Sequence, residues 1–170
     1  MRFIIADTHF CDKNIIPFAN RPFADVEEMN NAMIEKWNSV VGESDEVYVV
    51  GDYMDVSGVG KNLLGKLNGK KYLIKGNHDT LSNEVYRQMG FAEVYDVPII
   101  LDGFFILSHE PLYMNETMPY VNIFGHVHNN PIYKDCSKQH FCVSVERPHM
   151  SYVPIPFAKI KDIVQSLYKA

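Results

Sequence analysis

The sequence has few cysteines, no long hydrophobic run and no excess of positive charge. Its three cysteines, Cys11, Cys136 and Cys142, are odd in number and form no CxxC pair, which argues against a disulfide framework and favours a reducing compartment. No stretch reaches the roughly 18 apolar residues that span a membrane, and Asp7 interrupts the first apolar run before a signal-peptide core could form. We therefore expect a cytoplasmic protein without a membrane partner.

The charge balance argues against a long polyanionic partner. The chain has 16 lysines and arginines against 21 aspartates and glutamates, and its formal net charge is −5 at pH 7. Because basic residues supply most of the attraction to nucleic-acid phosphates, we do not expect long nucleic acid as a partner. A small phosphorylated substrate remains compatible with this charge, because bound cations can reverse its sign locally.

Internal repeats, low-complexity tracts and Gly/Ser-rich linkers are also absent, and 170 residues suit a single domain over 1–170. Apolar runs predict strands over 3–6, 47–50 and 72–74. Between the first two strands, Asp25 and Glu28 resemble a capping box, and apolar residues then recur at helical spacing up to Gly42. Leu63, Leu64 and Leu67 predict a short helix. Such alternation of strands and helices favours parallel pairing.

The second half of the chain has a different pattern. Residues 99–107 are apolar on both sides of Asp102-Gly103, which is a strong signal for a β-hairpin. Further strands are predicted over 121–124 and 141–145, and 157–168 predicts an amphipathic helix. We therefore predict a mixed α/β protein with two sheets.

Polar side chains follow five of the predicted strands, at the point where each strand ends. They are Asp7 and His9, then Asp52, then Asn77, His78 and Asp79, then His109, and finally His126 and His128. Taken singly, most of them have a simpler interpretation as turn residues, helix caps or isolated histidines. Ligands of open α/β sheets bind beyond the carboxyl ends of the strands, so the joint occurrence predicts one ligand site.

The donor types at these positions indicate a metal site. In an extended chain His126 and His128 face the same way, so their two imidazoles converge. Carboxylate and amide oxygens mixed with imidazole nitrogens suit Mn²⁺, Fe²⁺ or Zn²⁺ better than Mg²⁺ or Ca²⁺. Seven candidate ligands are too many for one tetrahedral ion and sufficient for two ions that share a carboxylate.

The order of these motifs resembles the calcineurin-like metallophosphoesterase superfamily. The matching series is Asp7-x-His9, Gly51-Asp52-x-x-Asp55, Gly76-Asn77-His78-Asp79, His109 and Gly125-His126-x-His128. The stretch from Asn14 to Phe23 is also similar to one found in small bacterial and phage-type predicted phosphoesterases. The resemblance implies a four-layer sandwich of two mixed β-sheets flanked by helices, the metallo-dependent phosphatase fold, with a dinuclear metal centre at one edge.

The resemblance also implies how the ligands are shared between two divalent ions. One ion takes Asp7, His9, Asp52 and His128. The other takes Asp52, Asn77, His109 and His126, so that Asp52 bridges both. We expect Mn²⁺, with Fe, Zn, Ni and Co as alternatives.

Catalytic roles follow from the same resemblance. His78 corresponds to the family's histidine near the leaving group, and Asp79 to its orienting partner. Asp55 receives no ligand role. His140 and His149 match no motif, and we expect both at the surface.

The implied activity is that of a hydrolase of phosphate esters. Two neighbouring cations would activate a bridging hydroxide for in-line attack on phosphorus, so no protein nucleophile is required. We expect small phosphodiesters as substrates. The alternatives are a phosphoprotein phosphatase, a small nuclease, or a non-catalytic metal-binding scaffold of the same fold. Loops 10–23 and 111–120 are expected to shape the pocket, with four candidate phosphate or base contacts: Asn20, Arg21, Tyr113 and Asn115. Arg21 could equally be solvated or pair with a carboxylate.

Overall fold

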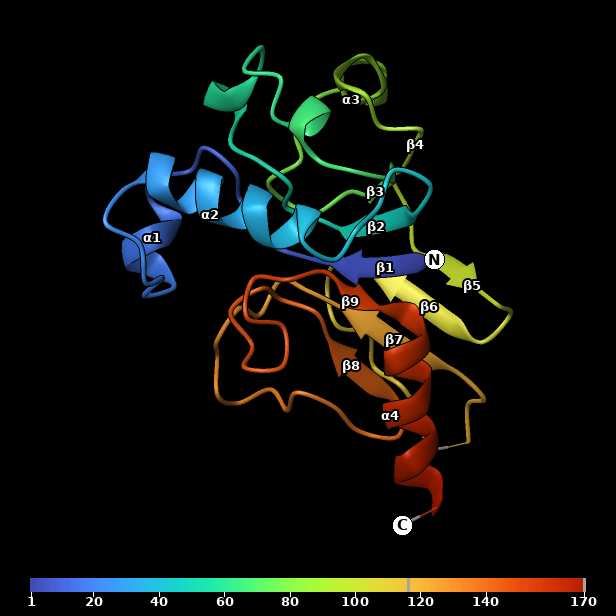
Figure 1. The fold of residues 1–170 in the computed structure, drawn as a ribbon. Coiled ribbons are helices and arrows are strands. Elements are labelled where there is room, and N and C mark those ends of the chain that lie inside the picture. The colour runs from blue at the N-terminus through green and yellow to red at the C-terminus, as the bar shows by residue number, and fades with distance from the viewer. Residues whose placement is uncertain (116, 170) are drawn as a thin grey trace.

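The computed structural model describes residues 1–115 and 117–169, which form two mixed β-sheets with helices beside them (Figure 1). The first sheet has the strand order β4-β3-β2-β1-β9 and the second the order β5-β6-β7-β8. The strands of the first sheet are β1 (Arg2–Ile5), β2 (Glu46–Val50), β3 (Lys70–Ile74), β4 (Glu93–Tyr95) and β9 (Ile155–Pro156). Those of the second are β5 (Ile99–Leu101), β6 (Phe105–Ser108), β7 (Val121–Phe124) and β8 (His140–Cys142). The predicted architecture of two mixed sheets with flanking helices is confirmed, and the single domain over 1–170 stays a prediction.

Strand direction brings the carboxyl ends of both sheets to one edge of the molecule. Strands β1, β2 and β3 pair in parallel, as predicted. Strand β4 is also parallel to β3, and β9 runs antiparallel to β1. Strands β6, β7 and β8 are also parallel, with β5 antiparallel to β6. A parallel bridge between Ala6 and Ser144 joins the two sheets just beyond β1 and β8. Side chains that follow β1, β2, β3, β6 and β7 therefore meet at this edge.

The predicted hairpin is present between β5 and β6. Asp102 and Gly103 both have positive φ, 52° and 68°, which suits the turn that such a hairpin needs. Strand β8 is shorter than the predicted strand over 141–145, because the chain beyond Cys142 leaves it to bridge β1.

The helices are α1 (Ile15–Phe18), α2 (Val26–Asn38), α3 (Asn83–Met89) and α4 (Phe157–Lys169), with 3₁₀ turns η1 (Val56–Gly58) and η2 (Leu64–Lys66). Asp25 caps α2 by accepting from the N–H groups of Glu27 and Glu28, and the Glu28 carboxylate accepts from the N–H of Ala24. The reciprocal contact of the predicted capping box is thus made one residue earlier. Sequence analysis did not predict α1, α3, β4 or β9.

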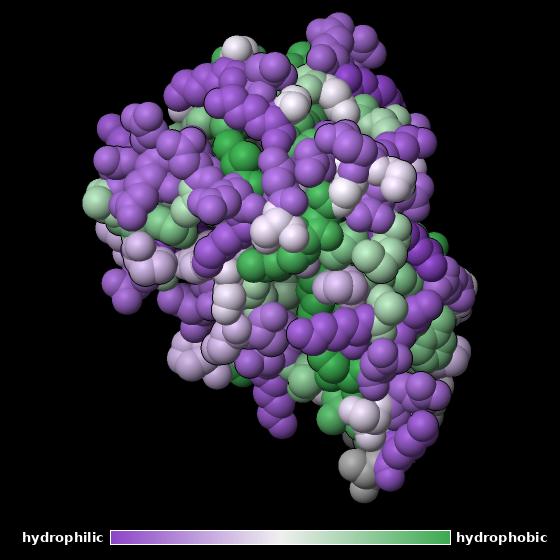
Figure 2. All heavy atoms as spheres, viewed as in Figure 1, coloured by the Kyte–Doolittle hydropathy of each residue, from purple (hydrophilic) through white to green (hydrophobic). Residues whose placement is uncertain are grey.

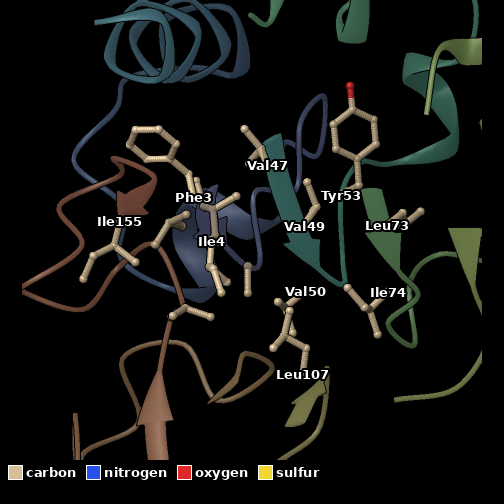
Figure 3. Packing of buried hydrophobic residues seen from close by; sticks show 14 of the residues in the cluster. Phe3, Ile4, Val47, Val49, Val50, Tyr53, Leu73, Ile74, Leu107 and Ile155 are labelled. Carbon is tan, nitrogen blue, oxygen red and sulfur yellow. The ribbon is translucent and has the colours of Figure 1, made fainter. Parts of the chain in front are cut away.

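The hydrophobic core lies between the two sheets and continues under α2. Figure 3 shows Val50 of β2 next to Leu107 of β6, with Ile155 of β9 in the same cluster. Met33 and Trp37 of α2 belong to this cluster and are each about 1% exposed. Each fully buried aliphatic or aromatic side chain stabilises the fold by about 1.5–3 kcal/mol. The strand ends that carry the polar residues are therefore held on a rigid base.

The outer surface is mainly polar on the face drawn in Figure 2, where hydrophilic residues surround smaller hydrophobic areas. Among residues 1–115 and 117–169, no helix has the length and apolar character needed to cross a membrane.

Candidate metal centre

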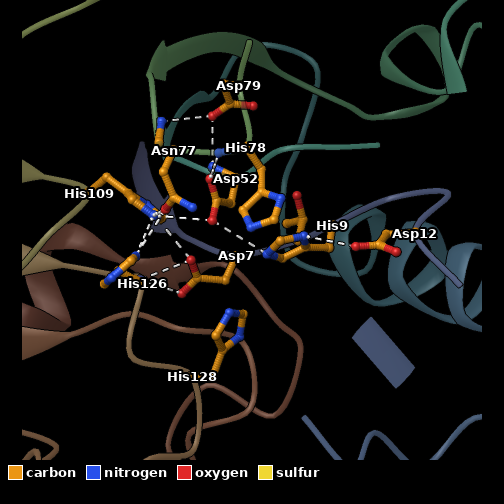
Figure 4. Close-up of polar contacts among 12 residues, drawn as sticks. Asp7, His9, Asp12, Asp52, Asn77, His78, Asp79, His109, His126 and His128 are labelled. Atoms are coloured by element: carbon orange, nitrogen blue, oxygen red, sulfur yellow. Dashed lines mark hydrogen bonds and ion pairs between the residues drawn. The ribbon is translucent and has the colours of Figure 1, made fainter. Parts of the chain in front are cut away.

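All seven predicted metal ligands come together at the shared edge of the two sheets (Figure 4). They follow β1 (Asp7, His9), β2 (Asp52), β3 (Asn77), β6 (His109) and β7 (His126, His128). The donor atoms of Asp7, His9 and His128, the first cluster, lie within 4.8 Å of one another. The same holds for Asp52, His109 and His126, the second cluster. Each cluster has the size of a single cation site.

Asp52 lies between the two clusters. Its Oδ2 is 3.5 Å from Nε2 of His9 and 3.2 Å from Nε2 of His109. The amide oxygen of Asn77 lies 3.0 Å from both His109 Nε2 and His126 Nδ1, which places Asn77 with the second cluster. The structure thus shows two candidate clusters with Asp52 close to both, and the two ligand sets that the resemblance implies stay a prediction.

The backbone is strained at most of these positions. Five of the seven have a positive φ, namely Asp7 (58°), His9 (46°), Asp52 (54°), His126 (69°) and His128 (46°). Residues other than glycine rarely adopt this region, and each such residue costs about 1–3 kcal/mol. Strain that gathers at one edge, with donor atoms aimed at two points, indicates a functional site.

Two glycines permit the close approach of these turns. A Cβ on Gly51 would lie 2.2 Å from Nδ1 of His109, and one on Gly76 would lie 2.3 Å from Oδ1 of Asp52. Both distances are shorter than any real Cβ contact, so a side chain at either position would push a ligand away. The glycines of the GD and GNHD motifs are thereby explained by packing against the site.

Hydrogen bonds orient two of the imidazoles. His109 donates through Nδ1 to the carbonyl of Val50 at 3.0 Å, and Nδ1 of His128 lies 3.0 Å from Oε1 of Glu146. Each bond leaves Nε2 free to bind a cation, which is the usual arrangement for metal-binding histidines.

The site also contains a buried nitrogen without a partner. Nε2 of His9 makes no hydrogen bond to any residue that the structure describes. Buried polar atoms are seldom left unpaired in folded proteins, so this nitrogen fits a cation ligand. The whole donor set of carboxylates, an amide oxygen and imidazoles fits divalent transition ions.

The charges of the site favour a positive occupant. Burial alone would raise the pKa of Asp52, but the neighbouring imidazoles of His109 and His9 bring it well below its usual range. Burial opposes the protonation of His109, yet Asp52 and Asp7 raise its pKa to about 9. Without a cation, the two carboxylates therefore hold a proton on His109, and a bound metal ion would take its place.

His78 has the position expected of a group that faces substrate. Its imidazole is exposed, and its ring centroid lies 5.0 Å from that of His9. Its backbone N–H donates to Oδ1 of Asp52 at 2.8 Å, which fixes the turn after β3 relative to the ligand that both clusters share.

Asp79 has a different neighbourhood from the one predicted. Its buried carboxylate accepts from the backbone N–H groups of Asp52 (2.7 Å), Tyr53 (3.0 Å) and Gly76 (2.9 Å). In the described part of the chain, no bond joins it to the His78 imidazole. The expectation that Asp79 orients the His78 ring is therefore wrong, and Asp79 instead holds the turns after β2 and β3 together.

A cleft of about 360 Å³ opens beside the first cluster. Its walls are His9, Asp12, Asn14, Ile15, Phe18, Asp55, His78 and His128. Loop 10–23 therefore shapes this cleft, as predicted. The described residues of loop 111–120 do not line it, and Tyr113 instead borders a separate hollow of about 470 Å³ together with Phe124 and His140.

Arg21 is 4% exposed and pairs with Glu146, which is one of the alternatives that the sequence left open for it. Two further expectations about single residues need correction. His140 and His149 were expected at the surface, but both are half-buried, with Nε2 close to the backbone carbonyls of Leu112 and Cys142.

Sequence reasoning also missed Glu146. It belongs to no strand-end motif and lies 18 residues from the His128 that it contacts, so no local signal marked it.

Several known proteins are similar to this chain. The chain matches the family described as calcineurin-like phosphoesterase over residues 3–140. It is 33% identical over 171 residues to the uncharacterized protein MJ1445 of Methanocaldococcus jannaschii, which covers 96% of this chain and 90% of that protein. It is 37% identical over 78 residues to the Gene 66 protein of Mycobacterium phage L5, which is 44% of this chain and 37% of that protein.

Two solved structures have a similar fold. A protein of unknown function, AQ665 from Aquifex aeolicus, superposes with a TM-score of 0.73 at 26% identity, over 96% of this chain and 98% of that one. The nuclease MPE of Pseudomonas putida gives a TM-score of 0.54 at 23% identity, over 75% of this chain and 61% of that one.

The family match spans most of the chain and includes all seven predicted ligands as well as His78. The chain therefore belongs to the calcineurin-like phosphoesterase family, whose members are metal-dependent hydrolases of phosphoric esters.

Proposed function

We propose that this protein is a dinuclear phosphoesterase that hydrolyses small phosphodiesters. The observation that carries the proposal is the cleft beside the first cluster, whose walls contain imidazoles and carboxylates but neither lysine nor arginine in the described part of the chain. The two clusters support two divalent cations, with Mn²⁺ favoured by the mixed oxygen and nitrogen donors.

The ligand roles in this proposal follow the two clusters. Asp7, His9 and His128 would hold one cation, Asn77, His109 and His126 would hold the other, and Asp52 would be shared between them. Two cations bound in this way would lower the pKa of a water molecule and stabilise charge on the phosphoryl oxygens.

The residues of the chain supply orientation and a proton. His78 projects into the cleft, where it can donate a proton to the departing oxygen. Its backbone is held by the bond to Asp52, and the turn around it by Asp79. The backbone of His78 is thus fixed, while its imidazole ring is accessible to substrate.

The charge of the cleft favours diesters over monoesters. A phosphomonoester carries about −1.5 to −2 charges at pH 7, whereas a diester carries one. Asp12 and Asp55 add negative charge to the cleft walls, and the guanidinium of Arg21 is engaged by Glu146. In the described part of the chain, the cleft walls therefore offer no lysine or arginine to balance the second charge of a monoester.

The shape of the cleft favours a small substrate. A volume of about 360 Å³ lies at the lower end of the range for small-molecule pockets. Phe18 of α1 stands at its wall, 77% exposed, with its ring centroid 5.8 Å from that of His128. An aromatic face at this place can stack on a ring in one substituent of a diester.

A substrate panel with added Mn²⁺ tests the proposal. We expect kcat/KM to be highest for small phosphodiesters and cyclic nucleotides, and lower for phosphomonoesters, phosphopeptides and long DNA. Elemental analysis after reconstitution should approach two ions per chain. A clear preference for phosphomonoesters would contradict the diester assignment, and saturation at one ion in a folded sample would contradict the bridging role of Asp52.

A further inference from the structure

A buried ion pair lies behind the first cluster. Nε and Nη2 of Arg21 donate to Oε1 of Glu146 at 2.9 and 2.7 Å, and the two side chains are 0% and 3% exposed. The cost of removing such charges from water often exceeds their mutual attraction. A pair this deep is therefore poorly explained by stability alone.

Glu146 connects the pair to His128. The same Oε1 lies 3.0 Å from Nδ1 of His128, so the carboxylate accepts from an imidazole as well as from a guanidinium. A carboxylate on Nδ1 fixes the ring orientation and makes Nε2 a stronger donor to a cation. Nε2 is the nitrogen that remains for the first cluster.

Arg21 connects the pair to the other two ligands. Its Nη2 donates to the backbone carbonyl of Asp7 at 2.6 Å, and its Nη1 to that of Thr8 at 3.0 Å. These carbonyls belong to the turn in which Asp7 and His9 both have positive φ. Because a strained turn persists only when its surroundings hold it, the guanidinium keeps both side chains in place.

Among the residues that the structure describes, no such pair supports the second cluster. In the second cluster, Nδ1 of His109 donates to the backbone carbonyl of Val50. The ion pair thus reaches all three ligands of the first cluster, and its side chains make no hydrogen bond to a ligand of the second.

We propose that Arg21 and Glu146 are a positioning pair that sets the affinity of the first cluster for its cation. This inference rests on the proposed two-cation function.

The test combines two changes with a matched control. Glu146→Gln keeps an acceptor oxygen for His128 and removes the charge. The double variant Arg21→Met with Glu146→Leu removes both charges, which often leaves stability unchanged when a buried pair is replaced by apolar side chains. Glu93→Gln is the control, because Glu93 forms an exposed ion pair with Arg87 and touches neither cluster.

Calorimetric titration of the metal-free proteins with Mn²⁺ gives two dissociation constants, and thermal unfolding reports the fold. In the double variant we expect one constant to rise by roughly 10–100-fold, as is typical when a partner of a metal ligand is lost. The other constant should stay within about threefold of wild type. Glu146→Gln should give a smaller rise of the same constant, and Glu93→Gln should change neither.

The outcomes separate this proposal from the one on which it rests. If wild-type protein binds fewer than two Mn²⁺ ions, the two-cation function fails. If it binds two and the folded variants keep both constants, or weaken both equally, the positioning role of Arg21 and Glu146 is wrong. If the double variant does not fold, the Glu146→Gln variant provides the test. Two unchanged Mn²⁺ dissociation constants in that variant would also overturn the proposal.

Discussion

The two ligand clusters contain similar donors but are supported in different ways. In the first, His128 is held by a carboxylate, and the turn with Asp7 and His9 by a guanidinium. In the second, His109 is held by a backbone carbonyl. The first cluster is almost wholly buried, whereas His126 in the second is exposed.

Two sites with similar donor sets can therefore differ in their affinity for a cation. Ligands held by ionised, buried partners lose less freedom when a cation binds, and their nitrogens are stronger donors. We therefore expect the first cluster to bind its cation more tightly than the second.

The largest effect is expected from Asp52→Asn, because Asp52 contacts histidines of both clusters. The loss of its charge should weaken both cations and lower kcat/KM by more than the roughly 10–100-fold typical for a residue that only supports a ligand. Ion counts and kinetics should be measured beside His9→Ala, which removes a ligand of the first cluster alone. A smaller defect in Asp52→Asn than in His9→Ala would show that Asp52 is not shared.

His78→Ala should lower activity without changing metal binding at either cluster. The exposed imidazole contributes to neither cluster, so both ions and the fold should be kept while the rate falls by roughly 10²–10⁴-fold. If His78 donates a proton, the loss should grow with the pKa of the leaving group in a diester series. Equal losses for nitrophenolate and alkoxide leaving groups would reject the role as an acid, and loss of a bound ion would make His78 a ligand.

Metal binding at the second cluster should depend on pH, because a cation and a proton compete for His109. Its pKa is raised to about 9, so its proton stabilises the folded, metal-free chain at low pH, and this contribution is lost as pH rises through that value. A cation replaces this proton. The rise in melting temperature caused by Mn²⁺ should therefore be larger at about pH 8 than at about pH 6. The same rise at both values would show that no proton is displaced.

The smallest effect is expected from Phe18→Ala, which alters the cleft wall and removes no ligand of either cluster. Stacking on an aromatic side chain contributes on the order of 1 kcal/mol, or about fivefold in affinity. KM should rise by that factor for diesters with an aromatic substituent and stay unchanged for dialkyl diesters. Tyr113→Ala serves as control, because Tyr113 is also exposed but lines the separate hollow. An equal rise for both substrate types would place Phe18 outside the substrate contact.

Much of the fold could be predicted because its signals are local. The strands around Ile4, Val49 and Leu73 are apolar runs bounded by turn residues, and Asp102-Gly103 marks a hairpin through its own φ preferences. By contrast, β9 has only two residues, and it is a strand because it lies against β1. The signals for α3, a capping Ser82 and a final Gly90, are present but enclose only seven helical residues.

The candidate ligands were also predictable from the chain alone. Each is a metal-binding residue type next to a strand end, and parallel strands bring such ends to one edge. Residue type and position relative to a strand are local properties, so Asp7, Asp52 and His128 could be named without coordinates.

The supports of the site were decided by contacts between distant parts of the chain. Arg21 and Glu146 are 125 residues apart, and Asp79 reaches back 27 residues to the N–H of Asp52. The sequence around one partner does not identify the other. Whether an arginine is buried or solvated depends on the tertiary structure and not on its neighbours in the chain. The sequence by itself therefore determines which metal-binding residue types follow which strands. How these side chains are held depends on which other side chains the two sheets bury beside them.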